Sequence, residues 1–170
     1  IIAGTRARRV LARLLLGSTS AALLQRSDRP LLLVPPGDID IVSLSLDRVV
    51  LHFGTVLAAI DLREQNAAQL GWASHLAGLA RQPLEFVTVL PADGLSDHEA
   101  ASALKARGSG LSPVTPHACI VRRGGVPAEI AHCARAEGAG LVVMGLRTQG
   151  RGAPGQIASE VVEHHDALVL

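Results

Sequence analysis

The hydrophobic positions of this chain fall in short runs that are bounded by glycine, proline and charged residues. The runs do not alternate strictly between apolar and polar positions, which is the pattern of strands buried on both faces in a parallel sheet. The pattern predicts strands at 31–34, 56–60, 84–90, 118–121, 141–144 and 167–170.

Helical patterns lie between these runs. Small and apolar residues recur every three or four positions through 64–81, which gives that segment one apolar stripe. Ser96 is a suitable N-cap for a second helix. Pro127 suits the first turn of a third helix and Gly138 suits its C-terminal end. The predicted helices cover 64–81, 97–107, 127–137 and 158–165.

Strands and helices therefore alternate from residue 56 onward. Such alternation implies an open parallel sheet with helices on both faces. We expect an α/β domain over 50–170, with five parallel strands in a flavodoxin-like order. Its length is close to the commonest size of a single domain.

Residues 1–36 do not fit inside this domain. The predicted elements are a strand at 1–3, a helix over about 10–26 and a strand at 31–34. A proline pair and Gly37 then break regular structure and begin a linker over 37–49. Because 38–49 alternates apolar and polar side chains, we expect it to form an edge strand or an extended connection.

The first segment and the last one share a single plan. Ile1–Val34 and Leu141–Leu170 each contain a short apolar strand that ends in glycine, an arginine- and glycine-rich loop, a helix and a second apolar strand. We therefore interpret 1–36 as the C-terminal remnant of a first copy of the domain. Both closing strands, 31–34 and 167–170, are strongly apolar edges, which are aggregation hazards unless they are paired. We expect them to meet, either within one chain or between the chains of a homodimer.

The composition excludes several classes of partner. The formal net charge is +1, which gives no general attraction to nucleic acid or to an anionic membrane. The chain has three aromatic residues, too few for a surface that stacks single-stranded bases. No apolar run reaches the length of about 18 residues that a membrane helix needs. The apolar residues at the start precede the basic ones, the reverse of a secretory signal.

Two cysteines, Cys119 and Cys133, lie in apolar surroundings without a C-x-x-C motif. We expect buried, reduced thiols, which fit a cytoplasmic location. No catalytic motif is present: there is no G-x-S-x-G, no H-E-x-x-H and no P-loop. We therefore name no catalytic residue and expect no resident metal.

The loop between Gly4 and Thr19 carries the clearest chemical signal. Gly17, Ser18 and Thr19 open a predicted helix, whose free N–H groups and dipole attract anions. Four arginines in the same loop add positive charge: Arg6, Arg8, Arg9 and Arg13. The alternative is an N-capped helix with solvated arginines.

This segment resembles the signature of the universal stress proteins, which is Gly, two residues, Gly, nine residues, Gly, then Ser or Thr. Gly4, Gly17 and Ser18 match that signature and Ala7 departs from it. LLLGSTSAALLQRSDRPLLLVPP is typical of the closing helix and strand of that family. The segments VLAAIDLREQNAAQLGWASHLAG, EFVTVL and RRGGVPAEIAHCARAEGAGLVVMG resemble the same family. The resemblance implies a tandem-type protein whose first copy is incomplete.

The resemblance also implies an adenine-nucleotide site. In ATP-binding members an acid after the first strand contacts the nucleotide, a residue of the second strand meets adenine, and a Gly/Ser loop cradles the phosphates. Asp61 and Val89 match the first two of these positions, and Gly145 matches the first glycine of the loop. Gly155 with Gln156 matches the Gly/Ser end of the loop when the helices are aligned, whereas keeping the nine-residue spacing gives Ala158-Ser159. In either alignment Thr148 stands at the second glycine.

The resemblance implies a regulatory protein that binds ATP or another adenine nucleotide, with magnesium only as the nucleotide's companion. The departures from the signature predict weak ATP binding, above ~100 μM, because the site loses one or two charge-assisted hydrogen bonds. Two alternatives remain: a nucleotide-hydrolysing enzyme of related α/β architecture, and a dimerisation module without a ligand.

Overall fold

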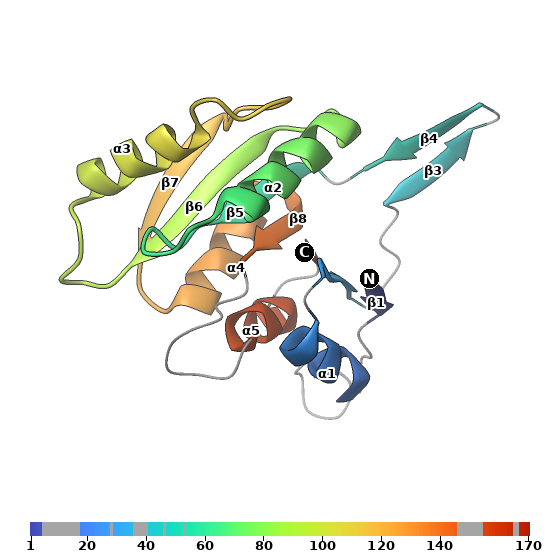
Figure 1. Ribbon diagram of the computed structural model, residues 1–170, viewed down its shortest axis with the longest axis horizontal. Coiled ribbons are helices and arrows are strands. Elements are labelled where there is room, and N and C mark those ends of the chain that lie inside the picture. The colour runs from blue at the N-terminus through green and yellow to red at the C-terminus, as the bar shows by residue number, and fades with distance from the viewer. Residues whose placement is uncertain are drawn as a thin grey trace.

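A computed structural model describes residues 1–4, 18–27, 29–35, 41–45, 47–52, 54–145, 155–164 and 167–170. Seven strands form one sheet in the order β1–β2–β9–β8–β5–β6–β7 (Figure 1). Their bounds are β1 Ile2–Gly4, β2 Leu32–Val34, β5 Thr55–Ala59, β6 Leu84–Leu90, β7 Ala118–Arg123, β8 Ala139–Met144 and β9 Leu168–Val169. The helices are α1 Ser18–Arg26, α2 Ala67–Ala80, α3 Asp97–Gly108, α4 Val126–Ala136 and α5 Gln156–His164.

The α/β class and the parallel sheet of the main unit are confirmed, but the expected strand order was wrong. β5, β6, β7, β8 and β9 are joined by parallel pairs. Counted from β5, their order is 3-2-1-4-5, whereas a flavodoxin-like sheet has the order 2-1-3-4-5. The chain moves outward from β5 to β7 and then returns to the other side of β5 with β8. The alternation of strands and helices along a sequence is the same in both orders, so it cannot distinguish them.

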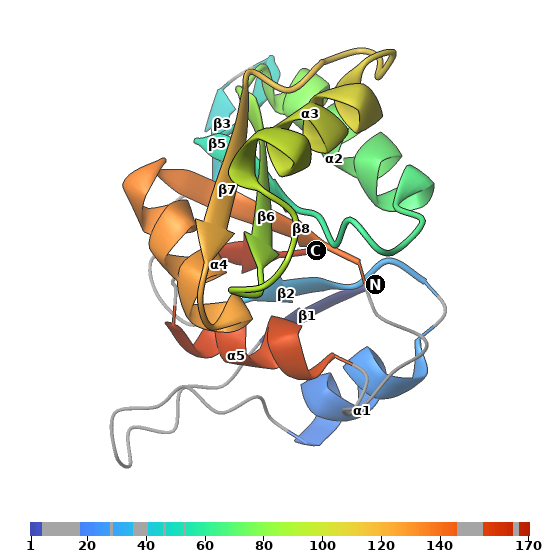
Figure 2. The same ribbon diagram turned by 90° about the vertical axis from the view of Figure 1, so that its left-hand side faces the viewer.

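Helices cover both faces of the sheet. On one face α1, α4 and α5 pack on strand residues that include Leu57, Val87 and Val142. On the other face α2 and α3 pack on residues that include Val56 and Phe86. Figure 2 shows α2 and α3 on one side of the sheet and α4 on the other. Because both faces are covered, the strands are apolar at successive positions, which is why their sequences do not alternate.

The three residues that the sequence marks as helix boundaries lie at or near helix ends in the structure. Ser96 accepts a hydrogen bond from the amide of Glu99, whose side chain accepts one from the amide of Ser96, so the two form a capping box at α3. Pro127 lies in the first turn of α4. Gly138 follows α4 with a φ of +61°, a conformation that favours glycine.

The first segment extends the sheet beyond β9, with β2 next to β9 and β1 as the edge strand. β1 pairs with β2 in parallel, as β8 does with β9. β2 and β9 lie antiparallel, with Leu33 opposite Val169, and this pairing lies within one chain. α1 and α5 lie side by side in both views (Figures 1 and 2). The interpretation of 1–36 as the remnant of a first copy stays a prediction.

The linker region contains a β-hairpin. β3 (Val42–Ser45) and β4 (Arg48–Leu51) pair antiparallel and form a separate two-stranded sheet. The sequence pattern predicted one edge strand or an extended connection here. The alternation continues in β3, whereas β4 is apolar at three successive positions. Residue 50, where we placed the start of the domain, lies inside β4. Residues 36–40 lie outside the described part of the chain.

Candidate functional site

Three of the residues expected to bind nucleotide lie at the carboxyl ends of the parallel strands. We call this end of the sheet the carboxyl edge. Ala59 near the end of β5 is opposite Met144 of β8 on one side and Val87 of β6 on the other. Asp61 follows two residues after Ala59, Val89 two after Val87, and Gly145 directly after Met144. The strand order reverses between β5 and β8, and ligands of open α/β sheets bind outside the carboxyl ends of the strands at such a point.

Gln69 of α2 bridges the two strands at this point. Its Nε2 donates to the carbonyl oxygen of Ala59 at 2.7 Å and to that of Val143 at 3.0 Å. The side chain is buried, so these bonds satisfy strand-end carbonyls that water would not reach easily. Gln69 therefore links α2 to the carboxyl ends of β5 and β8.

Close packing explains why residues 145 and 155, which we expect near the phosphates, are glycines. A Cβ atom at Gly145 would lie 2.9 Å from Oε1 of Gln69. Gly155 has a φ of +78°, and a Cβ there would lie 2.3 Å from Cγ of Leu24 in α1. Gly155 thus lies where α1 meets the start of α5, and Gln156 next to it donates to Glu160 at 3.0 Å. That Gly155 and Gln156 belong to the same nucleotide site as Asp61 stays a prediction.

The carboxylate of Asp61 is held by Arg63. Nε and Nη2 of Arg63 donate to the two carboxylate oxygens, each at 2.9 Å, and the Arg63 amide donates to Oδ1 at 3.0 Å. The Arg63 side chain is 74% exposed and that of Asp61 is 29% exposed. The hydrogen bond and the charge of Asp61 raise the pKa of Arg63, so its guanidinium stays charged.

Arg107, from the last turn of α3, holds the loop that carries Asp61. Its Nη1 donates to the carbonyl oxygen of Asp61 at 3.2 Å and to that of Glu64 at 3.1 Å, and it also bonds Oδ1 of Asn66. Its Nη2 donates to the carbonyl oxygen of Leu62. One guanidinium therefore satisfies four acceptors of a loop whose backbone would otherwise need water.

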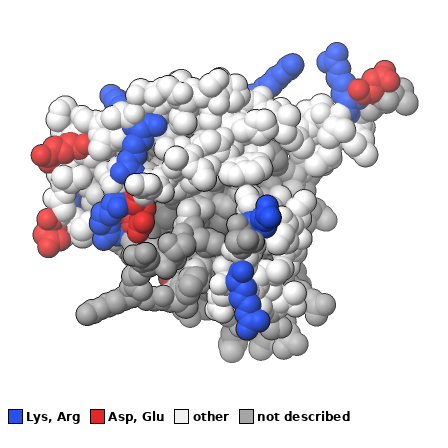
Figure 3. Space-filling model, in the orientation of Figure 1, with Lys and Arg blue, Asp and Glu red and all other residues white. Residues whose placement is uncertain are grey.

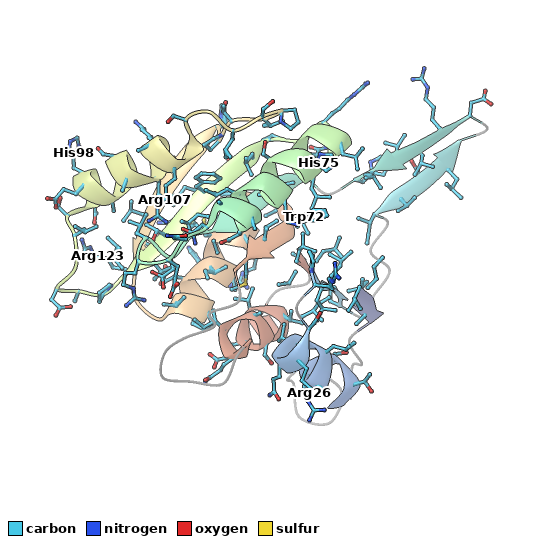
Figure 4. The ribbon with its side chains drawn as sticks, in the orientation of Figure 1. Arg26, Trp72, His75, His98, Arg107 and Arg123 are labelled. Atoms are coloured by element: carbon cyan, nitrogen blue, oxygen red, sulfur yellow. The ribbon has the colours of Figure 1, made fainter. Side chains whose placement is uncertain are left out.

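Arg123, at the end of β7, holds the next loop in the same manner. It donates to the carbonyl oxygens of Pro91 at 2.8 Å and Leu95 at 2.6 Å, and its Nε and Nη2 donate to Oδ1 of Asp97 at 3.0 and 2.9 Å. Figure 4 shows Arg107 and Arg123 toward the same end of the molecule. Both loops at the carboxyl edge are thus fixed by an arginine from a later element.

Charge is concentrated around this edge. The ion pair Arg63–Asp61 lies on the loop that follows β5, and the pair Arg123–Asp97 joins the end of β7 to the start of α3. By contrast α2, with the sequence AAQLGWASHLAGLA, has no charged residue, and Figure 3 shows an uncharged surface over its middle. A charged ligand would therefore meet complementary groups at the strand ends and not along α2.

Part of the first candidate loop is described. Gly4 ends β1, and the space where its Cβ would lie is open. Its carbonyl oxygen accepts a hydrogen bond from the buried Ser20 of α1 at 3.1 Å. Ser18 is the first residue of α1 and Thr19 is exposed. Gly17 and the four arginines lie outside the described residues, as does Thr148 of the last loop.

Other chemistry is limited in the part of the chain that the structure describes. There it holds no group of three or more His, Cys, Asp or Glu side chains that could bind a metal ion. Burial raises the pKa of both the Cys119 and the Cys133 thiol, and both are free cysteines. None of the described helices is long and apolar enough to cross a membrane.

Sequence reasoning did not identify Gln69, Arg63, Arg107 or Arg123. A weak signal existed for Arg63, which lies two residues after the predicted acid, and for Gln69, a lone amide beside the buried stripe of α2. Arg107 had no distinct signal, because a basic residue in the last turn of a helix is already explained by the helix dipole. Its partners lie 41 to 46 residues away in the sequence.

No protein-family model matches this sequence, and none of the curated proteins does. Solved structures do match. A universal stress protein from Archaeoglobus fulgidus DSM 4304 aligns with a TM-score of 0.69 at 19% identity over 99% of this chain, which spans 58% of that protein's length.

Two further structures contain nucleotides. A universal stress protein from Archaeoglobus fulgidus in complex with dAMP has a TM-score of 0.50 at 22% identity, over 69% of this chain and 96% of its own. A universal stress protein in complex with cAMP has a TM-score of 0.54 at 16% identity, over 69% of this chain and 94% of its own. The chain therefore has the fold of the universal stress proteins.

Proposed function

We propose that this chain is a universal-stress-type regulatory protein that binds an adenine nucleotide at the carboxyl ends of β5, β6 and β8. The observation that carries the proposal is the position of Asp61, Val89 and Gly145 at the carboxyl edge of the sheet. The strand order reverses at this point. Val89 belongs to β6, and Asp61 and Gly145 follow β5 and β8, so three strands of the sheet contribute to the proposed site.

The three residues offer complementary chemistry. The Asp61 carboxylate can accept hydrogen bonds from the hydroxyls of a ribose. Val89 is partly buried and offers an apolar side chain and a strand-end backbone to a flat base. Gly145 is exposed and lacks a side chain, so a phosphate could approach its backbone closely.

Two structures with the same fold support an adenine nucleotide as the ligand, since they are complexes with dAMP and cAMP. If ATP binds, magnesium would come with its phosphates, because the described residues offer no cluster of metal ligands. A cytoplasmic location belongs to the proposal, since both cysteines are free thiols.

A regulatory role is favoured over hydrolysis. Asp61 is the acid of the proposed site, and its carboxylate is engaged by Arg63, which leaves it poorly placed to activate water. We therefore expect no phosphate release from ATP by the purified chain. Steady phosphate release that Asp61→Asn abolishes would favour the hydrolase instead.

Isothermal titration with ATP tests the binding proposal. The expected result is a saturable site with a Kd above ~100 μM, which Asp61→Asn weakens at least about fivefold through the loss of an acceptor. Asp47→Asn, in the exposed turn of the β3–β4 hairpin, is the matched control and should bind like the unchanged chain. Equal affinity of both variants, or no binding at millimolar ATP, would contradict the proposal and favour a module without a ligand.

A further inference from the structure

The β3–β4 hairpin has one side that is entirely apolar. Because side chains alternate along each strand, the opposite pairs Val42–Leu51 and Leu44–Val49 share that side. Leu51 packs against the core at the base of the hairpin. Farther out, Leu44 is 80% exposed and Val49 is 65% exposed. We call the exposed residues Val42, Leu44 and Val49 the hairpin face.

The opposite side of the hairpin is mainly polar. It carries Ser43, Ser45 and Arg48 besides Val50, and Oγ of Ser43 is hydrogen-bonded to Nε2 of His52 at 2.8 Å. Figure 1 shows β3 and β4 extending away from the seven-stranded sheet. A hairpin of two strands alone is marginally stable in water. The hairpin face is therefore the side that would gain from a further surface to pack on.

α2 presents a second apolar surface. Ala68, Trp72, His75 and Leu79 are exposed and follow the spacing of one helix face, which we call the α2 face. Trp72 is 45% exposed and Leu79 is 62% exposed. Trp72 and His75 are labelled in Figure 4, and Figure 3 shows no charge over the middle of α2. A helix without Asp, Glu, Lys or Arg is normally buried all round, so this face also indicates a contact.

We propose that the hairpin face of one chain packs on the α2 face of a second copy, and that the two copies do this reciprocally. A two-fold dimer makes the same contact twice, so both faces of each copy become covered. The extension of the hairpin from the body of the chain allows it to reach a neighbour. This interface is separate from the pairing of β2 with β9, which lies within one chain.

The exposed area favours a reciprocal contact. At roughly 170–250 Å² for a fully exposed residue, the hairpin face offers about 350 Å² and Trp72 with Leu79 about 250 Å². A standard interface buries about 800 Å² per partner, of which about 60% is apolar. Each copy therefore needs about 500 Å² of apolar surface, which the two faces supply together and neither supplies alone.

The charges favour a second copy over a membrane surface. Apolar surfaces that bind anionic lipid are flanked by several basic residues. Asp47 and Arg48, next to each other at the hairpin turn, have opposite charges, and the α2 face has no charged residue. Two uncharged apolar faces can pack on each other without burying an unpaired charge.

Sedimentation equilibrium of the full chain tests the proposal. The unchanged chain should dimerise with a dissociation constant of about 1–100 μM, since the interface is at the lower end of the standard sizes. Val49→Glu should raise this constant at least about thirtyfold, because each dimer contains the substitution twice. Val50→Glu is the matched control, on the next residue and the opposite side of the hairpin, and should stay within about threefold of the unchanged chain.

The α2 face is tested in the same way. Leu79→Lys should weaken the dimer at least about thirtyfold, whereas Leu95→Lys, at an exposed leucine before α3, should stay within about threefold. A mixture of Val49→Glu and Leu79→Lys chains can form a dimer in which one contact is unchanged and the other brings opposite charges together. The mixture should therefore dimerise at least about ten times more tightly than either variant alone.

Four results would overturn the proposal. The first is an unchanged chain that remains a monomer at about 200 μM, above the expected dissociation constant. The second is an equal effect of Val49→Glu and Val50→Glu. The third is a dimer that Leu79→Lys does not weaken, which would mean that two hairpins contact each other. The fourth is a mixture that dimerises no better than its components. Leu44→Ser, a milder change on the hairpin face, should also weaken the dimer, and thermal unfolding checks the fold of each variant.

Discussion

Gln69 of α2 and Gly145 meet at the carboxyl ends of the paired strands β5 and β8, where Oε1 of Gln69 lies 2.9 Å from the place that a Cβ atom of residue 145 would take. The same amide group donates to both strands through its nitrogen, so it cannot turn away from Gly145 without giving up those bonds. The glycine at 145 and the glutamine at 69 are therefore coupled.

Gly145→Ala should destabilise the chain by about 1 kcal/mol, because Gln69 must move and weaken its bonds to the strand-end carbonyls. In a Gln69→Ala background the same substitution should cost much less, and urea unfolding of all four chains measures the coupling. Gly71→Ala on the exposed side of α2 is the control. Nothing lies within 4 Å of its Cβ position, so it should stabilise the helix by about 0.5–1 kcal/mol. Equal costs of Gly145→Ala in both backgrounds would show that the two residues are independent.

Gly155→Ala should be more costly, for two separable reasons. Its φ of +78° strains any side chain, and its Cβ would lie 2.3 Å from Cγ of Leu24. Gly110→Ala is the matched control, since Gly110 has a φ of +96° with nothing within 4 Å of its Cβ position. We expect about 1–2 kcal/mol of strain at both positions and at least about 1 kcal/mol more at Gly155 from overpacking. Thermal unfolding checks this difference. If Leu24→Ala does not remove the excess cost at Gly155, the contact between α1 and α5 is not its source.

Arg107 and Arg123, at the carboxyl edge, should each slow the amide hydrogen exchange of one loop. Arg107→Lys keeps the charge but loses the fork that reaches four acceptors, so amide exchange in 61–66 should accelerate at least about tenfold, which corresponds to about 1.4 kcal/mol of local stability. Arg123→Lys should do the same for 91–97 and leave 61–66 unchanged. Hydrogen exchange read by mass spectrometry distinguishes the two loops. Faster exchange throughout the chain in either variant would mean that the arginine stabilises the whole fold.

The strands and helices could be predicted because their signals are local. The run 84–90 coincides with β6, and Ser96 caps α3 as its spacing to Glu99 allows. The order of the strands in the sheet could not be predicted from periodicity. The side of the sheet on which each new strand is added does not change the alternation of strands and helices along the sequence. The β3–β4 hairpin was missed because the two residues between its strands, Leu46-Asp47, are not one of the Asn-Gly or Asp-Gly pairs that mark a tight hairpin turn.

The candidate site was predicted only in part, for a related reason. Asp61 and Gly145 follow predicted strands, so their position at the carboxyl edge could be predicted from the sequence. Their immediate partners, Gln69, Arg63 and Arg107, depend on side-chain contacts. Gln69 bonds Val143, 74 residues away, and Arg107 bonds Asp61, 46 residues away. No spacing rule in a single sequence reports such contacts.

Glu85 should give the chain a pH-dependent stability. It is a buried residue of β6, and its Oε2 has no hydrogen-bond partner in the described part of the chain. Burial raises the pKa of Glu85, repulsion by Glu137 adds to the rise, and His117 partly offsets it. A pKa that is higher in the folded than in the unfolded state stabilises folding below the unfolded value of about 4.3. That stabilisation is lost as the pH rises through the folded pKa.

Glu85→Gln removes this ionisation. The variant should gain about 1 kcal/mol over the unchanged chain at pH 7.5, the lower end of the cost of an unpaired buried polar group, and the gain should vanish near pH 4. Glu99→Gln is the control of opposite sign. Hydrogen bonds from the side chain and amide of Ser96 lower the pKa of Glu99, so its ionisation stabilises the fold at neutral pH and this contribution is lost as the pH falls. Thermal unfolding from pH 4 to 8 should therefore show the stability difference from the unchanged chain rising with pH for Glu85→Gln and falling for Glu99→Gln. A difference for Glu85→Gln that is the same at every pH would mean that Glu85 has the same pKa in the folded and unfolded chain.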